Sequence, residues 1–495
     1  MLPRLRFSGT AIDPAELDDE RLRVAAGLHR QDVREGAAVA AMLRNSPAHV
    51  ALVLACRAAG IYLVEINWHF KAGEVAHLLA DSGARLLFVQ SDLLDRIEPG
   101  IPAGVGIVIV DPVADLVPDP AADSAAGAAA RSPIKPRDRA GCRPIRWEDF
   151  GVGDPPMPPR IGLPHATIAY TSGTTGRPKG VRRLPAPPEA RAEREAGQRT
   201  LNARIFGATA DSTVLLSAPI YHSAPMSYLV HACNVGATLL LEASFDAERT
   251  LALISRHRVT HAYLVPTMFQ RLLALDAATR ARYDVSSVRQ VTSTGSPCAP
   301  DLKRRMIDWW GPVITEAYAS SETGYITFID SADWLAHPGS AGRAVGAARI
   351  RILDESGREM PPGAVGLIYA CQPVTPDFTY LNNDEARRAL ERDGLFTLGD
   401  IGTLDADGYL FICDRKADMV ISGGANIYPA EIEAVLQTMP GVADCAVFGI
   451  PDPEFGEVLA AAVQPASGTS VEAVRAFLRE RIAGFKVLRV VTFHA

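Results

Sequence analysis

Short apolar segments alternate with helical segments in the N-terminal part of the chain, and this alternation limits the possible folds more than any other feature. Val39–Leu43, Tyr62–Ile66 and Arg85–Val89 are apolar and short enough to be buried strands. Ser46–Gly60 has the signals of a helix, because serine can cap its start, proline can follow at the first position and glycine can end it. Alternating strands and helices predict a parallel sheet with helices on both faces.

The alternation returns in the middle of the chain and then gives way to other patterns. A helix is also expected at 71–82, and strands at 105–110, 214–217, 237–242, 261–265 and 288–292. Residues 111–160 are rich in proline, alanine and aspartate and predict an excursion from the sheet. From Ala347 to Tyr369, short strands with glycine-rich turns predict an antiparallel or barrel-like subdomain. Beyond residue 414, the pattern predicts a compact α+β lid.

Composition sets limits on the class of protein. A chain of 495 residues is too long for one core and predicts two or three domains. The net charge of −7 argues against a nucleic-acid-binding surface, which is usually basic. Seven scattered cysteines without a CxxC pair indicate reduced thiols in a cytoplasmic protein. We also expect no transmembrane segment, since the most apolar helix, Ser46–Gly60, is interrupted by His49 and Arg57.

One loop is rich in groups that bind phosphate. It contains four hydroxyl residues, three glycines and one lysine: Thr171, Ser172, Gly173, Thr174, Thr175, Gly176, Lys179 and Gly180. Glycine lets backbone amides approach an anion at positive φ, hydroxyls donate hydrogen bonds, and lysine adds positive charge. A Walker-type loop is excluded, because Gly173 and Gly176 are too close together and neither Ser nor Thr follows Lys179.

This loop resembles the phosphate loop of the adenylate-forming superfamily, which includes acyl-CoA synthetases, adenylation domains of peptide synthetases and firefly-type luciferases. Further matches occur in the family's order, at Pro219–Ser223, Ser293–Pro297, Tyr318–Gly324, Leu398–Asp400 and Asp414–Glu433. The ordered series is more specific than any single motif. The resemblance is strongest to a fatty-acid or related acyl-CoA ligase.

The resemblance implies the fold and the domain boundaries. We expect an α/β protein whose large N-terminal domain, residues 1–413, consists of two stacked α/β subdomains plus a β-barrel-like subdomain. Residues 414–418 would form a hinge, and residues 419–495 a small mobile α+β C-terminal lid domain. Ala417 occupies a hinge position where relatives usually have aspartate or lysine.

The resemblance also assigns a reaction to the site. ATP, Mg²⁺ and coenzyme A would be used to convert a carboxylic acid first to an acyl-adenylate and pyrophosphate, and then to a thioester and AMP. The loop residues Thr171 to Gly176 and Lys179 would hold the β- and γ-phosphates. Glu322 would be the magnesium ligand, because Mg²⁺ prefers carboxylate and phosphate oxygens. Ser321 would donate to phosphate, and Ala319 replaces a usual glycine.

Other positions would contact the nucleoside and the acid. Gly295, Ser296 and Pro297 resemble the turn that packs on adenine, and Tyr318 belongs to the same nucleotide site. Asp400 is expected at the ribose, because one carboxylate can accept from both hydroxyls. Arg415 could reach that ribose or a phosphate. His222 would lie at the edge of the acid pocket, which the run Tyr221–Tyr228 would line together with 294–297 and 323–326.

Three functions remain open at this stage: an acid–CoA ligase acting on a hydrophobic monocarboxylic acid, a stand-alone adenylation enzyme that loads a carrier protein, and a non-catalytic binder of an acyl-adenylate or nucleotide. The third depends on a lysine that relatives carry in a loop after the last strand. That lysine is not in the sequence, which ends at Phe493-His494-Ala495, so either a tail is missing from it or the chain is naturally truncated. We do not assign this role to Lys486. A homodimer is one possible state.

One feature after the phosphate loop is unusual for the family. Arg182 and Arg183 follow the loop directly, and a proline-rich piece leads into a charged helix at Pro188–Asn202. We expect this helix to be a solvated flank.

Overall fold

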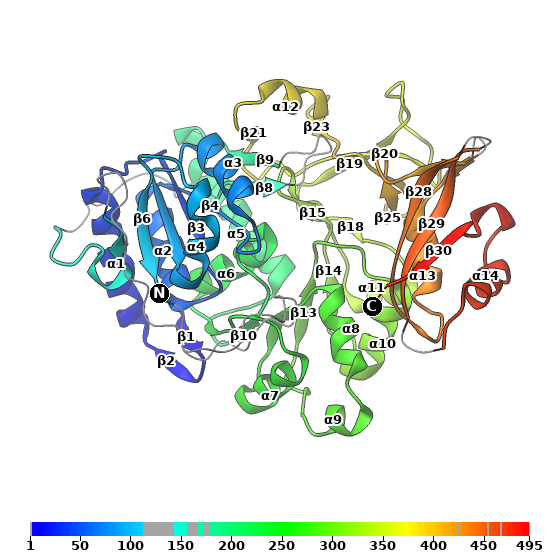
Figure 1. Cartoon of the computed structure of the whole chain (residues 1–495), viewed down its shortest axis with the longest axis horizontal. Helices are drawn as coiled ribbons and strands as arrows, with labels where there is room; N and C mark the ends of the chain where they lie inside the picture. Colours follow the sequence, from blue (N-terminus) through cyan, green and yellow to red (C-terminus); the bar gives the residue numbers. More distant parts are fainter. Residues whose placement is uncertain are drawn as a thin grey trace. The chain divides into compact units, whose positions relative to one another are not determined.

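A computed structural model of the chain describes residues 2–111, 143–155, 167–171, 178–422, 425–452, 455–465 and 468–494. The chain forms two compact units. Unit 1 comprises Met1–Gly295, Ser320–Gly324 and Pro373–Ala389, and unit 2 comprises Ser296–Ala319, Tyr325–Gln372 and Leu390–Ala495. Figure 1 shows the elements of both units coloured along the sequence.

The first sheet of unit 1 is parallel and has the order β4-β3-β5-β6-β7. Its strands are β3 (Ala38–Met42), β4 (Tyr62–Glu65), β5 (Leu86–Gln90), β6 (Gly106–Val110) and β7 (Ile145–Arg146). Its helices are α1 (Pro14–Arg30), α2 (Pro47–Ala59), α3 (Ala72–Ser82) and α4 (Ser91–Ile97). The predicted strand–helix alternation is therefore confirmed here. Most of the predicted excursion at 111–160 lies outside the described residues.

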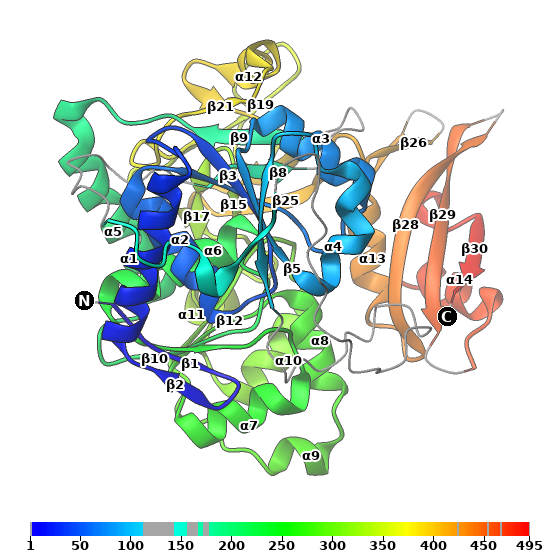
Figure 2. The same ribbon diagram turned by 60° about the vertical axis from the view of Figure 1, so that its left-hand side comes forward.

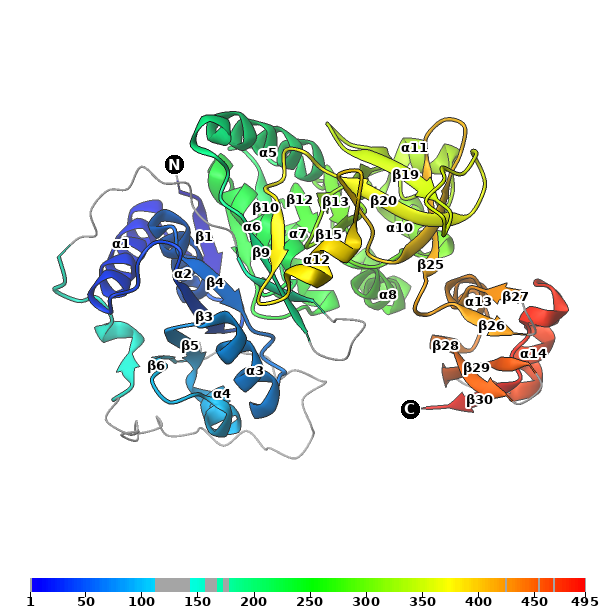
Figure 3. The same ribbon diagram turned by 90° about the horizontal axis from the view of Figure 1, so that it is seen from above.

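The two faces of this sheet are covered by different helices. Leucines of α3 and α4 join alternate strand residues such as Ala40 and Leu87 in one buried cluster. Helices α1 and α2 pack against each other, and Figure 3 shows them away from α3 and α4. Helix α2 begins and ends as predicted: the Ser46 side chain accepts a hydrogen bond from the backbone of His49, and Gly60 has φ +66°.

The second sheet of unit 1 contains the N-terminal strand, which the sequence pattern did not predict. Its parallel strands run in the order β13-β12-β10-β11-β1, and β2 adds antiparallel to β1. The strands are β1 (Arg4–Phe7), β2 (Thr10–Ile12), β10 (Thr213–Leu216), β11 (Thr238–Leu241), β12 (His261–Tyr263) and β13 (Gln290–Ser293). The associated helices are α5 (Arg191–Phe206), α6 (Ser223–Val235), α7 (Ala247–His257), α8 (Pro266–Ala274) and α9 (Ala277–Ala281). Figure 2 shows the hairpin of β1 and β2 in dark blue, and β11 lies between β1 and β10 in the sheet.

The charged helix after the phosphate loop is only partly the solvated flank that we expected. Helix α5 runs four residues beyond the predicted end at Asn202, and its last turns bury Leu201, Ile205 and Phe206. Phe206 packs edge to face on Tyr228 of α6, with ring centroids 5.3 Å apart. The prediction fails at this end because the apolar residues there cover the sheet, whereas the charged residues before them remain at the surface.

A small antiparallel sheet in unit 1 has the order β21-β9-β8. Its strands are β8 (Ala169–Thr171), β9 (Lys179–Arg183) and β21 (Phe378–Tyr380), and α12 (Asp384–Leu390) follows β21. Gly180 lies inside β9, and a Cβ there would stand 2.9 Å from Leu381 and 3.0 Å from Tyr170. Gly180 therefore serves close packing of the strands and not, as we expected from the loop, a positive φ.

Unit 2 contains the predicted antiparallel subdomain. Its main sheet has the order β22-β23-β20-β24-β25, with β19 added to β20. The strands are β19 (Arg349–Leu353), β20 (Gly366–Cys371), β22 (Glu391–Arg392), β23 (Leu395–Phe396), β24 (Asp400–Leu404) and β25 (Leu410–Arg415). Other elements are α10 (Pro300–Trp310), β14 (Ile314–Glu316), α11 (Ser331–Ala336) and the pair β17 (Thr327–Phe328) and β18 (Arg343–Ala344).

The C-terminal part of unit 2 is the expected α+β arrangement. It consists of β26 (Val420–Ser422), β27 (Ala425–Ile427), α13 (Pro429–Leu436), β28 (Val442–Asp452), β29 (Gly456–Pro465), α14 (Val471–Arg479) and β30 (Val490–Phe493). Residues of α13 and α14 such as Ile432 and Leu478 pack on Leu459 and Val463 of β29 in one core. Among the helices that the structure describes, none has the length and apolar character needed to cross a membrane.

Candidate functional site

The two ends of the phosphate loop meet in the small sheet of unit 1. Thr171 is the last residue of β8 and pairs with Lys179, the first residue of β9. The Lys179 ammonium lies 5.4 Å from the ring centre of Tyr380 on β21. The intervening candidates Ser172, Gly173, Thr174, Thr175 and Gly176 lie outside the described residues. The strands thus fix Thr171 and Lys179 opposite each other at the mouth of the loop.

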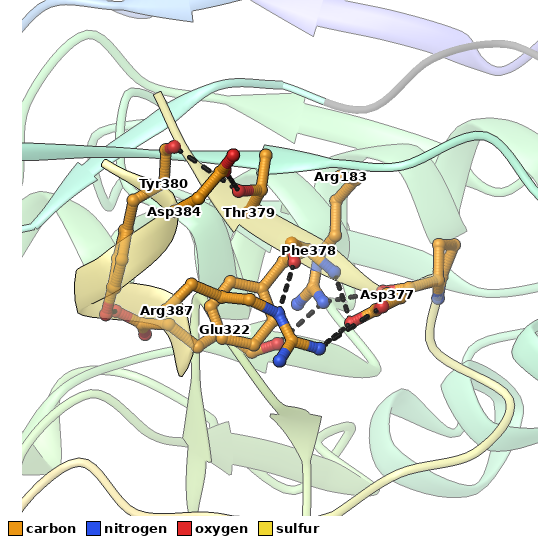
Figure 4. A network of polar contacts seen from close by, with 9 residues as sticks. Arg183, Glu322, Asp377, Phe378, Thr379, Tyr380, Asp384 and Arg387 are labelled. Atoms are coloured by element: carbon orange, nitrogen blue, oxygen red, sulfur yellow. Dashed lines mark hydrogen bonds and ion pairs between the residues drawn. The ribbon is translucent and has the colours of Figure 1, made fainter. Parts of the chain in front are cut away.

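Glu322 is a buried carboxylate with a defined set of partners. It is only 6% exposed. Its Oε1 accepts a hydrogen bond of 2.9 Å from the hydroxyl of Tyr380, and its backbone carbonyl accepts one of 2.6 Å from Arg183. Figure 4 shows Glu322 between Tyr380 and Arg183. Among the described residues, none donates a hydrogen bond to Oε2, so one carboxylate oxygen is available to a hard cation.

Ser321 and the start of α6 come together beside Glu322. The Oγ atoms of Ser321 and Ser223 are 3.0 Å apart. His222 occupies the N-cap position of α6 without making a side-chain cap, and its ring lies 4.4 Å from that of Tyr221. Burial lowers the pKa of His222, so its imidazole is neutral at pH 7. The structure therefore places the predicted residues Glu322, Ser321 and His222 in one region of unit 1.

Asn45 holds the segment that leads into His222, and sequence reasoning did not identify it. Its buried amide donates to the carbonyls of Ala218 and Glu242 at 2.9 and 3.0 Å, and its Oδ1 accepts from the backbone N–H of Ile220 at 2.9 Å. Asn45 thereby ties the carboxyl end of β3 to the carboxyl end of β10, where ligands bind in open α/β sheets.

Asp400 in unit 2 is a second buried carboxylate, and both of its oxygens have partners. Oδ2 accepts a hydrogen bond of 2.5 Å from the hydroxyl of Tyr318, and Oδ1 accepts one of 3.2 Å from Nε of Arg415. Asp400 and Arg415 also face each other in the pairing of β24 with β25. The structure thus brings three of the residues predicted at the nucleoside, Tyr318, Asp400 and Arg415, into direct contact within unit 2.

The candidate adenine turn follows β13 directly. Gly295, Ser296 and Pro297 are all exposed, and Gly295 has φ +99°. A Cβ at Gly295 would meet no atom within 4 Å, so glycine is required there by the backbone conformation and not by lack of space. The turn therefore exposes its backbone and its short side chains to solvent.

The segment predicted as a hinge is anchored at its first residue. One carboxylate oxygen of Asp414 accepts a hydrogen bond of 3.0 Å from the backbone of Ala430 in the first turn of α13. Burial raises the pKa of this carboxyl. The turn at Lys416 and Ala417 follows, and Lys416 forms an exposed ion pair with Glu355. Lys486, farther along the chain, is paired with Glu431.

Sequence reasoning missed Arg183, Tyr380 and Asn45 for different reasons. Arg183 stood out as an unusual charge after the loop, but its partners at 321, 322 and 376 are remote in sequence. Tyr380 lies in a short strand that carries no motif, and only the pairing of Tyr380 with Val181 brings it to the loop. Asn45 carried no signal beyond its position at the end of a strand.

Comparison with known families and proteins agrees with this arrangement. The family model of the AMP-binding enzymes matches residues 4–375, and the model of the AMP-binding enzyme C-terminal domain matches residues 431–495. The chain is 34% identical to a feruloyl-CoA synthase of an Amycolatopsis species over 99% of this chain and 91% of the relative. It is 32% identical to an indoleacetate–CoA ligase of Aromatoleum aromaticum over 99% of this chain and 90% of the relative.

Solved structures show the same fold. ATP-bound MatB from Rhodopseudomonas palustris superposes with a TM-score of 0.82 at 27% identity, covering 99% of this chain and 91% of that one. The o-succinylbenzoate coenzyme A synthetase MenE of Bacillus subtilis, in complex with ATP and magnesium ion, gives a TM-score of 0.80 at 26% identity, covering 100% and 93%.

The chain therefore belongs to the AMP-binding, adenylate-forming enzyme superfamily. Within it, the chain is an AMP-forming acyl- or aryl-CoA ligase that uses ATP, Mg²⁺ and coenzyme A. The described residues fit the metal, since Glu322 offers a buried carboxylate with one oxygen unpaired within the described part of the chain. When bound, Mg²⁺ neutralises the charge of the phosphates, which would otherwise repel an attacking carboxylate.

Proposed function

We propose that this ligase activates a hydrophobic monocarboxylic acid, and specifically one with an aromatic ring. The observation that carries the proposal is the make-up of the run Tyr221–Tyr228, which we expect to line the acid pocket and which is aromatic at both ends. Tyr228 of α6 packs on Phe206 and on Tyr263 of β12, with ring centroids 5.3 and 5.8 Å apart. The run Tyr221–Tyr228 contains no lysine or arginine that could pair with a second carboxylate. The names of two relatives, feruloyl-CoA synthase and indoleacetate–CoA ligase, point to the same class of acid.

In unit 1 we assign the phosphates and the metal. Thr171, Lys179 and the loop between them hold the β- and γ-phosphates, because hydroxyls, backbone amides and an ammonium stabilise the leaving pyrophosphate. Glu322 is the magnesium ligand, and Ser321 donates to phosphate. Neutral His222 lies at the carboxylate end of the acid, where an imidazole that carries no charge can donate without trapping the acid as an ion pair.

We assign the nucleoside to a further set of residues. Asp400 accepts from the ribose hydroxyls, and Arg415 supports it. Tyr318 orients Asp400 through its hydroxyl, and the turn Gly295–Pro297 packs on adenine. The domain boundaries are part of the same proposal: residues 1–413 bind ATP and the acid, residues 414–418 act as the hinge, and residues 419–495 form the lid that changes pose between the two half-reactions.

Loading of a carrier protein is the second candidate, and one relative favours it. The chain is 29% identical over 98% of its length to a fatty acid–[acyl-carrier-protein] ligase of Streptomyces coeruleorubidus. An amino-acid substrate is disfavoured, because the segment Ala224–Tyr228 offers no aspartate for an α-amino group. A homodimer and a cytoplasmic location remain predictions of the sequence.

Two assays on the purified protein test the proposal. Acid-dependent exchange of labelled pyrophosphate into ATP should be strongest with aryl acids such as ferulate or indoleacetate and weaker with straight-chain acids of equal size. AMP release should then rise on addition of coenzyme A. Exchange without a response to coenzyme A, but with a response to an acyl carrier protein, would favour the second candidate. Absence of exchange with every acid would contradict both.

A further inference from the structure

Arg183, on the central strand β9 of the small sheet, makes an unusual set of hydrogen bonds. Its Nη1 donates to the carbonyls of Glu322 and Pro376 at 2.6 and 2.7 Å, and its Nη2 donates to the carbonyl of Ser321 at 2.6 Å. All three acceptors are backbone oxygens, and they belong to two segments far apart in sequence. Figure 4 shows the guanidinium between these segments. No carboxylate of the described residues forms an ion pair with it.

The guanidinium is desolvated without the compensation of a salt bridge. Burial lowers the pKa of Arg183 to about 10, and the nearby charges of Glu322 and Asp377 oppose this effect. The side chain is still protonated at neutral pH. A charge kept in such a place is costly unless its donors are satisfied. Its three short hydrogen bonds to carbonyls meet that need, and they fix the backbone that carries Ser321 and Glu322.

The opposite strand holds the other end of Glu322. Phe378 of β21 pairs with Arg183 of β9, and Tyr380 pairs with Val181. Tyr380 donates to the Glu322 carboxylate, whereas Arg183 holds the Glu322 backbone. Two paired strands therefore hold Glu322: β9 binds its backbone through Arg183, and β21 binds its side chain through Tyr380. One of these strands begins at Lys179, the lysine of the phosphate loop.

We propose that Arg183 and Tyr380 are positioning residues that hold the Glu322 carboxylate in register with Lys179, so that magnesium and the phosphates of ATP bind as one unit. The inference rests on the role proposed for Glu322. Tyr380 occupies Oε1, which leaves Oε2 to face the metal, and Arg183 prevents the backbone of 321–322 from moving away. Neither residue touches the reacting atoms, so both act through Glu322.

Binding of ATP measured by calorimetry, with Mg²⁺ or with EDTA, tests this role apart from catalysis. A lysine ammonium also has three donors, but they all radiate from one nitrogen and cannot reproduce the planar fork in which Nη1 and Nη2 reach separate carbonyls. Arg183→Lys should therefore weaken binding of MgATP roughly tenfold, as loss of a residue supporting a metal ligand commonly does. Binding of ATP in EDTA should stay within about twofold of wild type. Tyr380→Phe removes one hydroxyl from a strand that otherwise remains paired, and it should show the same selective loss.

Arg387 offers a matched control in the same network. It donates to the carbonyl of Phe378 at 3.1 Å and pairs with the Asp377 carboxylate at 3.1 Å, and no hydrogen bond joins it to residues 321–322 within the described chain. Arg387→Lys should therefore leave the difference between MgATP and metal-free ATP unchanged, even if the protein unfolds at a lower temperature.

The outcomes separate this inference from the proposed function. A wild-type protein that exchanges pyrophosphate, together with Arg183→Lys and Tyr380→Phe variants that bind MgATP as tightly as wild type, would overturn the inference alone. If Arg183→Lys does not fold, unchanged MgATP binding by Tyr380→Phe is sufficient to overturn it. A wild-type protein without exchange for any acid would instead contradict the proposed function. An equal loss of MgATP affinity in Arg387→Lys would show that the loss comes from general destabilisation of the protein. This result would also overturn the inference.

Discussion

Two buried carboxylates, Glu322 in unit 1 and Asp400 in unit 2, have the same exposure of 6% and the same first partner, a tyrosine hydroxyl. They differ in the second oxygen. Oδ1 of Asp400 accepts from Arg415, whose side chain is 62% exposed, whereas Oε2 of Glu322 has no donor among the described residues. A buried acceptor left open is suited to a cation, and an acceptor paired with an exposed arginine can exchange that partner for a ligand hydroxyl.

The largest effect should follow from Glu322→Gln. The amide can still accept from Tyr380 but lacks the charge that a magnesium ion requires. We expect the rate of acid-dependent pyrophosphate exchange to fall more than roughly 100-fold, because a metal ligand matters more than its supporting residues. Measurement of exchange over a range of Mg²⁺ concentrations checks this. If the variant exchanges pyrophosphate at the wild-type rate at ordinary Mg²⁺ concentrations, Oε2 of Glu322 is not a magnesium ligand.

Asp400→Asn should have the next largest effect. The asparagine oxygen can accept from Tyr318, but its amide cannot accept from a second ribose hydroxyl. Hydrogen bonds to a charged group contribute about 1.5–3 kcal/mol, so the KM for ATP should rise roughly 10- to 100-fold with little change in the Mg²⁺ requirement. Steady-state kinetics with ATP and with 2′-deoxy-ATP check this. A mutant that discriminates between the two nucleotides as well as wild type would refute the ribose assignment.

Arg415→Gln should raise the KM for ATP less than Asp400→Asn does. It tests whether Arg415 only supports Asp400. An exposed ion pair contributes about 0.2–1 kcal/mol, which corresponds to an increase of at most roughly fivefold in the KM for ATP. The same kinetic assay applies. If the loss equals that of Asp400→Asn, Arg415 contacts the nucleotide itself and does not only support Asp400.

The smallest effect should come from pH, and the two units should respond in opposite senses. Burial lowers the pKa of His261 in unit 1 from 6.5 to about 4. Between these values the unfolded chain binds a proton that the folded chain does not, so unit 1 loses stability as pH falls below about 6.5. Burial raises the pKa of Asp414 in unit 2, so that group disfavours folding as pH rises above its ordinary value of 3.8.

Calorimetric scans at about pH 5 and pH 7 test this difference. The transition of unit 1 should be about 2–4 °C lower at the acidic pH, and His261→Gln should reduce the shift. A shift that persists in the variant would assign the pH dependence to other groups.

Local patterns were sufficient for much of the fold. Helix α2 begins and ends at the predicted residues because its serine, proline and glycine act within one turn of the chain. Strands β3 to β6 and β10 to β13 of the two parallel sheets were predicted within two residues at each end, since continuous apolar runs indicate burial on both faces. Strand β1 was not predicted. Its four residues, Arg4–Phe7, alternate between charged and apolar side chains, and this short pattern becomes a strand through its pairing with β11.

By itself the sequence determined the family, the order of the motifs and the residue types that the chemistry needs, because each motif acts through the backbone and side chains of a few neighbouring residues. Only the tertiary structure decided how Glu322 and Asp400 are held. Their partners Tyr380, Arg183 and Tyr318 are 58, 139 and 82 residues away in the chain. Strand pairing brings such residues together over distances at which no local pattern survives, and the pairing is set by burial of the whole sheet.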